Sequence, residues 1–237
     1  MSNNAAVPKV KQSSSLHMIA TLTGVAFFSG FLIFFVVQAT EGGIRQNRID
    51  QLRGAVFEVL PEATSSQGFA VENGTFRPID IDDPTPGLRK IYAGYDDSGA
   101  LVGVAIEAAA QGYQDVIRGI YGYDPFTERV VGFSVLESSE TPGLGDRIAH
   151  DPSFLENFFE TEESPDTVSL ALDDEGDALE QPLSLVDRDE KTEPWEVEGI
   201  SGATVSCLAV VRMLNQSAQE VVPLIHTHLD QLQKGTL

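Results

Sequence analysis

The stretch KIYAGYDDSGALVGVAIE (residues 90–107) holds two runs of β-branched, aromatic and small apolar residues on either side of the turn sequence Asp96–Gly99. Runs that flank a turn of this kind predict a pair of antiparallel strands. A second stretch, VIRGIYGYDPFTERVVGFSVLE (residues 116–137), repeats the arrangement around Asp124–Thr127. The predicted strands cover residues 90–95, 100–107, 116–123 and 129–137.

Helices are predicted before and after these strands in the sequence. Apolar residues recur at helical spacing over residues 41–60, and Pro61 ends that segment. A short helix is predicted over 151–160, and a long amphipathic helix over 203–233, which Pro223 would interrupt. Strands grouped between helices indicate the α+β class, with antiparallel strands and flanking helices in one domain.

An apolar segment precedes this domain. From Met18 to Ala39 no residue carries a charge, and a helix of that length rises about 33 Å, which matches a hydrocarbon core of roughly 30 Å. The alternative is a cleaved signal peptide, whose apolar stretch usually has about 7–15 residues and ends at a small-residue cleavage site. Residues 38–40 make a poor site of that kind. We therefore expect an N-terminal tail over 1–17, a single transmembrane helix over 18–39 and one domain over 41–237.

The charges beside the apolar segment leave the orientation open. Lys9 and Lys11 precede it, and Arg45, Arg48 and Arg53 follow it. Positive charge favours the cytoplasmic side, but long domains translocate largely regardless of flanking charge.

The composition excludes several kinds of site. With 36 acidic and 15 basic side chains the net charge is −21, so no nucleic-acid partner is expected. Cys207 is the only cysteine, which rules out an intramolecular disulfide or a Cys-rich metal site. The acidic stretch 161–198 is interpreted as a solvated surface segment. A cation site within it is the alternative, but it lacks the ligand spacing of a calcium hand; its candidate ligands are Asp173, Asp174, Glu175 and Asp177.

The sequence Ser201-Gly202-Ala203-Thr204 opens the last predicted helix. In a purely structural interpretation Ser201 or Thr204 caps the helix, and the two small residues are packing spacers. In a functional interpretation the free N–H groups and the helix dipole favour a phosphate. Gly202 and Ala203 then let a bulky group approach, and the threonine hydroxyl is available to be esterified to that phosphate.

Residues 137–146, ESSETPGLGD, follow a predicted strand. This segment is either an ordinary loop or one wall of a ligand pocket, in which Glu140 and Thr141 hydrogen-bond a heterocycle and Leu144 covers a ring face. The sequence Gly112–Tyr113 lies just before another strand. Its tyrosine is either an aromatic residue at the edge of the core or a further ligand contact.

These motifs occur in an order that resembles the G subunit of the Rnf ion-translocating electron transport complex, a covalently flavinylated family. The resemblance covers the chain from about residue 18 to the C-terminus. It rests on the N-terminal span, GYQDVI (residues 112–117), ETPGLG (140–145) and SGAT (201–204). The C subunit of the sodium-pumping NADH:quinone reductase shares the last two motifs, whereas GYQDVI and GDRI (145–148) fit the Rnf protein better.

The resemblance implies a cofactor and its site. FMN would be joined through a phosphodiester bond to the hydroxyl of Thr204, by a separate flavin transferase that uses FAD. Ser201, Gly202 and Ala203 would form the rest of the recognition sequence. The isoalloxazine pocket would contain Glu140, Thr141, Gly143 and Leu144, with Gly112 and Tyr113 nearby. No catalytic residue and no metal ligand are expected.

The resemblance also implies a place and a role. The domain would lie outside the cytoplasmic (inner) membrane, and other membrane subunits of the complex would be its partners. Two departures concern the polarity of the pocket. The family often has a histidine where residues 137–139 are Glu-Ser-Ser, and commonly an aspartate where Glu198 stands.

We therefore expect an electron-relay subunit of a translocase rather than a stand-alone catalyst. One alternative is a flavinylated carrier of another system, such as a protein like the C subunit of a sodium-translocating quinone reductase or a carrier for an extracellular reductase. Another is a membrane-tethered binding or assembly module without redox function, in which both motifs are only structural.

Overall fold

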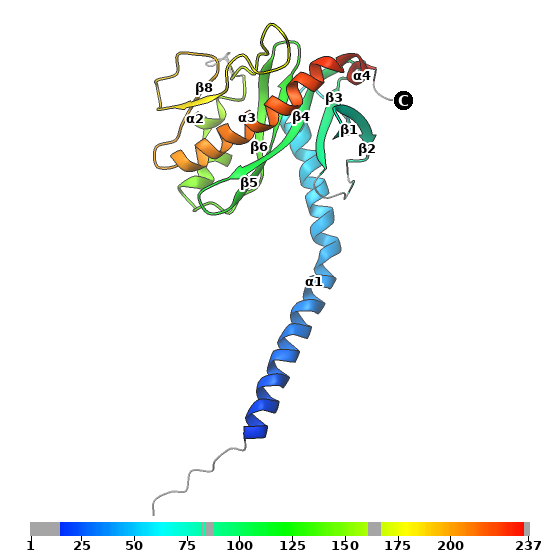
Figure 1. Cartoon of the computed structure of the whole chain (residues 1–237), viewed down its shortest axis with the longest axis vertical. Coiled ribbons are helices and arrows are strands. Elements are labelled where there is room, and N and C mark those ends of the chain that lie inside the picture. Colours follow the sequence, from blue (N-terminus) through cyan, green and yellow to red (C-terminus); the bar gives the residue numbers. More distant parts are fainter. Residues whose placement is uncertain (1–14, 82, 84–87, 161–166, 235–237) are drawn as a thin grey trace, which may run out of the picture. The chain divides into compact units, whose positions relative to one another are not determined.

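The structure is a computed structural model that describes residues 15–81, 83, 88–160 and 167–234. It divides into two compact units, Met1–Arg48 and Ile49–Leu237. Most of the predicted N-terminal tail and part of the acidic stretch lie outside the described residues. Figure 1 shows the order of the elements along the chain.

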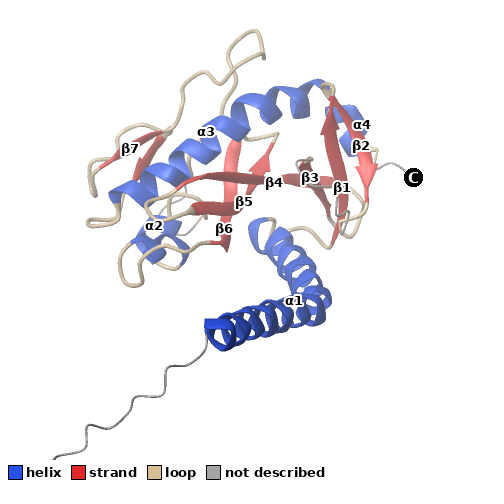
Figure 2. Cartoon of the chain, turned by 60° about the horizontal axis from the view of Figure 1, so that its bottom comes forward, coloured by secondary structure: helices blue, strands red, loops and turns tan. Residues whose placement is uncertain are grey.

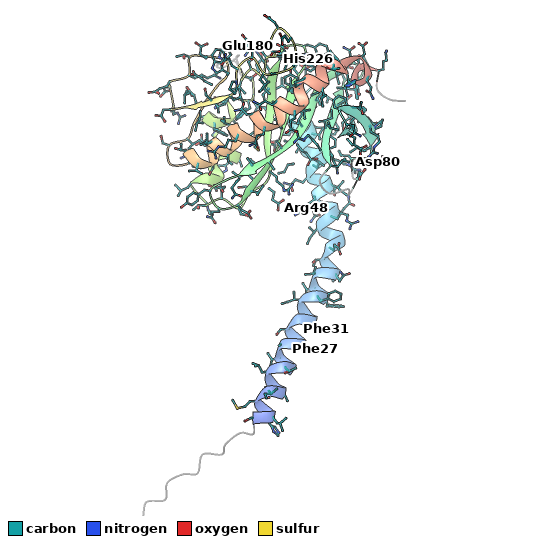
Figure 3. The ribbon with its side chains drawn as sticks, in the orientation of Figure 1. Phe27, Phe31, Arg48, Asp80, Glu180 and His226 are labelled. Carbon is teal, nitrogen blue, oxygen red and sulfur yellow. The ribbon has the colours of Figure 1, made fainter. Side chains whose placement is uncertain are left out.

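The first unit is the greater part of helix α1 (Ser15–Val59). Of the described helices, only α1 is long and apolar enough to cross a membrane, with a mean hydropathy of 2.2 over its most apolar window, none of which is buried. Phe27 and Phe31 project away from the helix (Figure 3). The predicted apolar segment and the predicted helix after it are one continuous helix.

The second unit is built on a six-stranded antiparallel sheet with the order β2-β1-β3-β4-β5-β6. Its strands are β1 (Ser65–Glu72), β2 (Thr75–Ile79), β3 (Arg89–Tyr95), β4 (Leu101–Gln111), β5 (Val116–Asp124) and β6 (Arg129–Glu137). The four strands predicted from the sequence are present, and the predicted α+β class is confirmed. The hairpin of β1 and β2 was not predicted.

Both faces of the sheet are covered. Because neighbouring residues of a strand point to opposite faces, each strand supplies side chains to both layers. Helix α3 (Thr204–Thr227) crosses one face, as Figure 2 shows, where it contacts β4 and β5. Its buried residues share one core cluster with Ile91, Ile106 and Tyr121. On the other face, Val56 and Val59 at the end of α1 pack on residues that include Tyr92, Ala105 and Ile120.

Two glycines allow the end of α1 to approach the sheet closely. A Cβ atom at Gly122 would clash with the carbonyl oxygen of Val59, and one at Gly132 would lie 2.5 Å from the Cα of Val59. Larger residues would therefore push the last turn of α1 away from β5 and β6.

The remaining elements are short. They are η1 (Gly145–Ala149), α2 (Pro152–Leu155), a parallel pair of β7 (Ser184–Val186) and β8 (Glu196–Glu198), and α4 (Leu229–Gln233). The helix predicted over 151–160 ends early at α2. There the Asn157 amide donates to the carbonyl of Phe154, and it exchanges hydrogen bonds with the backbone of Glu198, in competition with the helix.

The predicted interruption at Pro223 is wrong. Helix α3 continues through Pro223 to Thr227, and the break falls at His228, before α4. A proline inside a helix removes one backbone donor, and here the core contacts of Val222 and Ile225 on either side hold the helix together.

Candidate functional site

The Ser-Gly-Ala-Thr sequence forms a tight turn into α3. Thr204 is the first residue of the helix, and its side chain is exposed, as are Ser201 and Gly202. Gly202 has a φ of +85°, which disfavours any residue with a side chain. Ala203 is the N-cap residue and no side chain caps the helix, so the interpretation in which Ser201 or Thr204 serves as the cap is wrong.

Two side chains hold the backbone of this turn by hydrogen bonds. The backbone N–H of Ile200 donates to Sγ of Cys207 over 3.4 Å, and Nη1 of Arg147 donates to the carbonyl of Ser201 over 3.4 Å. Arg147 also forms an ion pair with Asp151. Cys207 is fully buried, and burial raises the pKa of its thiol. It therefore packs inside the turn as an unreactive group.

Two of the motifs and the first turn of α3, which follows the third, meet at Glu140. This side chain is only 6% exposed. Its Oε1 accepts a hydrogen bond from the backbone N–H of Gln114 over 3.0 Å, and its Oε2 accepts one from the hydroxyl of Ser206 in the first turn of α3. The amide of Gln114 donates to Oγ1 of Thr141 over 2.6 Å. Both oxygens of Glu140 therefore face protein donors.

Large apolar side chains are exposed around this junction. Tyr113 is 70% exposed and Leu144 is 50% exposed. Leu144 lies beside Gly202, because a Cβ at Gly202 would be 3.9 Å from its Cδ2. Gly143, with a φ of +77°, turns the chain just before Leu144.

A cavity of about 350 Å³ opens beside Thr204. The residues that line it are Leu185, Val186, Asp187, Arg188, Glu190, Gly199, Ile200, Ser201 and Thr204. Arg188 is the one cationic side chain among the described residues that line it. The sequence did not predict that residues 185–190 line this cavity, because they belong to the acidic stretch. The pairing of β7 with β8 places them beside the turn.

A buried carboxylate oxygen near the motifs has no protein donor. Oδ1 of Asp146, next to Gly145, makes no hydrogen bond with the described residues. Among those residues, no group of three or more His, Cys, Asp or Glu side chains is arranged to hold a metal ion. In the acidic stretch, Asp173 accepts a hydrogen bond from the backbone N–H of Asp177 over 3.1 Å.

Comparison with known proteins agrees with the motifs. Residues 112–219 match the family model described as the FMN-binding domain. The chain is 26% identical over 207 residues to the G subunit of the ion-translocating oxidoreductase complex of Methanosarcina acetivorans, a match that covers 86% of this chain and 93% of that protein. It is 42% identical over 62 residues to the G subunit from Haemophilus influenzae strain Rd, covering 26% of this chain and 30% of the relative.

Two solved structures share the fold. The crystal structure of Shewanella oneidensis NqrC superposes with a TM-score of 0.58 at 20% identity, over 80% of this chain and all of that one. The C subunit of the Na(+)-translocating NADH-quinone reductase from Parabacteroides distasonis gives 0.55 at 17% identity, over 76% of this chain and 94% of that one. The predicted resemblance to the Rnf G subunit, with a domain like that of NqrC, is confirmed.

Proposed function

We propose that this chain, similar to the G subunit of ion-translocating oxidoreductase complexes, is a flavin-carrying electron-transfer protein with FMN bound covalently to Thr204. The observation that carries the proposal is the exposed Thr204 in the first turn of α3, inside the segment that matches the FMN-binding domain.

The residues around Thr204 fit a phosphate ester. Without a side-chain cap, the first N–H groups of the 24-residue α3 are available, and the positive end of the helix dipole favours an anion. The adjoining cavity falls within the size range of small-molecule sites, about 300–1,000 Å³. Arg188 in its wall offers a charge-assisted hydrogen bond to a phosphate oxygen.

The rest of a flavin also finds suitable groups here. Leu144 and Tyr113 offer exposed apolar surface for a ring face, and Gly202 leaves room beside Leu144. When bound, FMN supplies reversible electron transfer; the chain binds it, orients it and limits its contact with water.

Attachment requires a separate flavin transferase with FAD as donor. The Oγ of Thr204 would form a bond to the phosphorus of the FMN moiety, and the pyrophosphate P–O bond would break. AMP would leave, and the hydroxyl proton would pass to solvent or to the transferase. The exposure of Thr204 supports this step, because a second enzyme must reach the hydroxyl.

We further propose that the domain lies on the outer face of the cytoplasmic membrane. In this arrangement residues 1–17 are cytoplasmic, residues 18–39 span the membrane and residues 41–237 are extracytoplasmic. The uncharged segment inside α1 supports the span. A covalent link would retain the flavin where a dissociated molecule would diffuse away. Other membrane subunits of the complex would be the electron-transfer partners.

Substitution of Thr204 tests the attachment. Full-length chain co-expressed with a flavin transferase should show flavin fluorescence that comigrates with the denatured protein on a gel, and a peptide mass increased by FMN at Thr204. Thr204→Val should abolish both signals without lowering the Tm, because the side chain is exposed and similar in size. Thr204→Ser keeps a hydroxyl and serves as the matched control. A fluorescent Thr204→Val band would refute the assignment.

A role like that of NqrC in a quinone reductase is the second candidate. It is favoured by the fold shared with the two quinone-reductase structures. Purification of the intact complex and identification of the neighbouring subunits separates the two candidates.

A further inference from the structure

We propose that Glu140 is a positioning residue that holds the first turn of α3, and with it the hydroxyl of Thr204, in the geometry that flavin attachment needs. This inference rests on the proposed attachment site. It assigns to Glu140 a role different from the direct contact with the heterocycle that the resemblance implied.

The carboxylate of Glu140 joins three segments that are distant in sequence. It is buried in the loop before η1, its Oε1 binds the N–H of Gln114 between β4 and β5, and its Oε2 binds the hydroxyl of Ser206 in α3. Since a carboxylate accepts from several donors at once, one side chain fixes the relative position of all three segments.

Two glycines make room for this carboxylate. A Cβ at Gly112 would lie 2.6 Å from Oε1 of Glu140, and a Cβ at Gly145 would lie 2.6 Å from Oε2 and 2.5 Å from Oγ of Ser206. Any side chain at either position would displace Glu140. The glycines that begin GYQDVI and end ETPGLG are thereby explained as clearance for a structural carboxylate.

The link to Thr204 is short. Ser206 follows Thr204 by two residues within the first helical turn. This turn has no side-chain cap to restrain it, so the hydrogen bond to Glu140 supplies a restraint from the side. Because the first turn of a helix is prone to fraying, loss of this bond would let the Thr204 hydroxyl sample orientations that the transferase cannot use.

A matched pair of serines on α3 tests the role. Ser206→Ala removes the donor to Glu140, whereas Ser217→Ala removes another buried hydroxyl of the same helix, which is 2.9 Å from the Tyr121 hydroxyl and remote from Thr204. Unmodified full-length protein in detergent is incubated with flavin transferase and FAD, and kcat and KM for FMN incorporation are measured with the Tm of each variant. We expect Ser206→Ala to lower kcat about tenfold, as small misplacements of reacting groups do, with Ser217→Ala close to wild type.

A second series varies Glu140 itself. Glu140→Gln keeps the shape and one oxygen acceptor, so its kcat should lie between that of wild type and that of Glu140→Ala. Exposed Glu156 provides the control variant Glu156→Gln. Wild-type rates in both Ser206→Ala and Glu140→Gln would overturn the proposal. Equal rate losses in Ser206→Ala and Ser217→Ala, in proportion to the loss of Tm, would also overturn it. Failure of the wild-type protein to acquire FMN would instead refute the proposed function.

Discussion

The two ends of α3 are anchored in different ways. At the C-terminal end, Nε2 of His226 lies 2.9 Å from the Tyr123 hydroxyl, and Nε2 of His228, just past the helix, lies 3.0 Å from the carbonyl oxygen of Gly74. Figure 3 shows His226 toward this end of the helix. At the N-terminal end Thr204 is exposed and the helix has no side-chain cap. The restraint there comes from Glu140 in the loop before η1 and from Arg147 in η1. One helix thus keeps the groups that stabilise the fold apart from the group that we expect to be modified.

The largest expected effect on stability is at the C-terminal end. Ile225 is fully buried in the core beneath α3, so Ile225→Ala should lower the free energy of unfolding by about 2–5 kcal/mol. Incorporation of FMN per folded molecule should stay at the wild-type level, because the cavity created by the substitution is remote from Thr204. Urea unfolding and the transferase assay measure the two quantities separately. A loss of FMN incorporation in the folded fraction would contradict the claim that the two ends of α3 act independently.

A pH-dependent effect is also expected at this end. Burial, and secondarily the charge of Glu128, raises the pKa of Tyr123. In the unfolded chain tyrosine titrates near pH 10. Above about pH 10 the unfolded state therefore loses the proton first, and the free energy of unfolding falls as pH rises.

Tyr123→Phe removes this contribution and should reduce the slope of stability against pH above about pH 10. Near neutral pH the variant should be less stable by the contribution of the lost hydrogen bond to His226. Unfolding curves at a series of pH values give both quantities. An unchanged slope would show that Tyr123 ionises freely in the folded protein.

The smallest effect is expected on the rate of FMN incorporation, beside the N-terminal end of α3. Arg188 lines the cavity beside Thr204, and its loss would remove one charge-assisted contact to a phosphate. Arg188→Gln should slow incorporation of FMN by about threefold to tenfold, in keeping with one such bond, with the Tm unchanged. Arg212→Gln, at an exposed position on α3, loses the same charge elsewhere. Equal effects of the two variants would indicate a response to net charge and not a contact at the site.

The strands around the two turns could be predicted because apolar and aromatic residues mark them and turn residues separate them. Strand β1 escaped prediction because Ser65, Ser66 and Gln67 give its first half the composition of a loop, and its pairing with β3 decides its conformation. The pair of β7 and β8 escaped because each strand has three residues and finds its partner at a distance in sequence.

The candidate site was predictable as a set of motifs but not as an arrangement. Thr204 lies at a helix start, as the pattern Ser-Gly-Ala-Thr predicts, and its attachment to FMN stays a prediction. The sequence did not show that Glu140 faces Gln114 and Ser206, because side-chain direction in a loop depends on the tertiary contacts. The position of Arg188 beside the turn could not be predicted, because it depends on the pairing of β7 with β8.

The close fit of α1 against Gly122 and Gly132 has a practical consequence for experiments on a soluble fragment. Gln51 donates to the carbonyl of Leu136, and Glu58 accepts from Ser134, so the final turns of α1 are joined to β6 along its length. A fragment cut at Pro61 would bare the apolar patch around Tyr92 and Ile120 and should aggregate. Trimming the chain at or before residue 49 removes most of the apolar helix while leaving that patch covered.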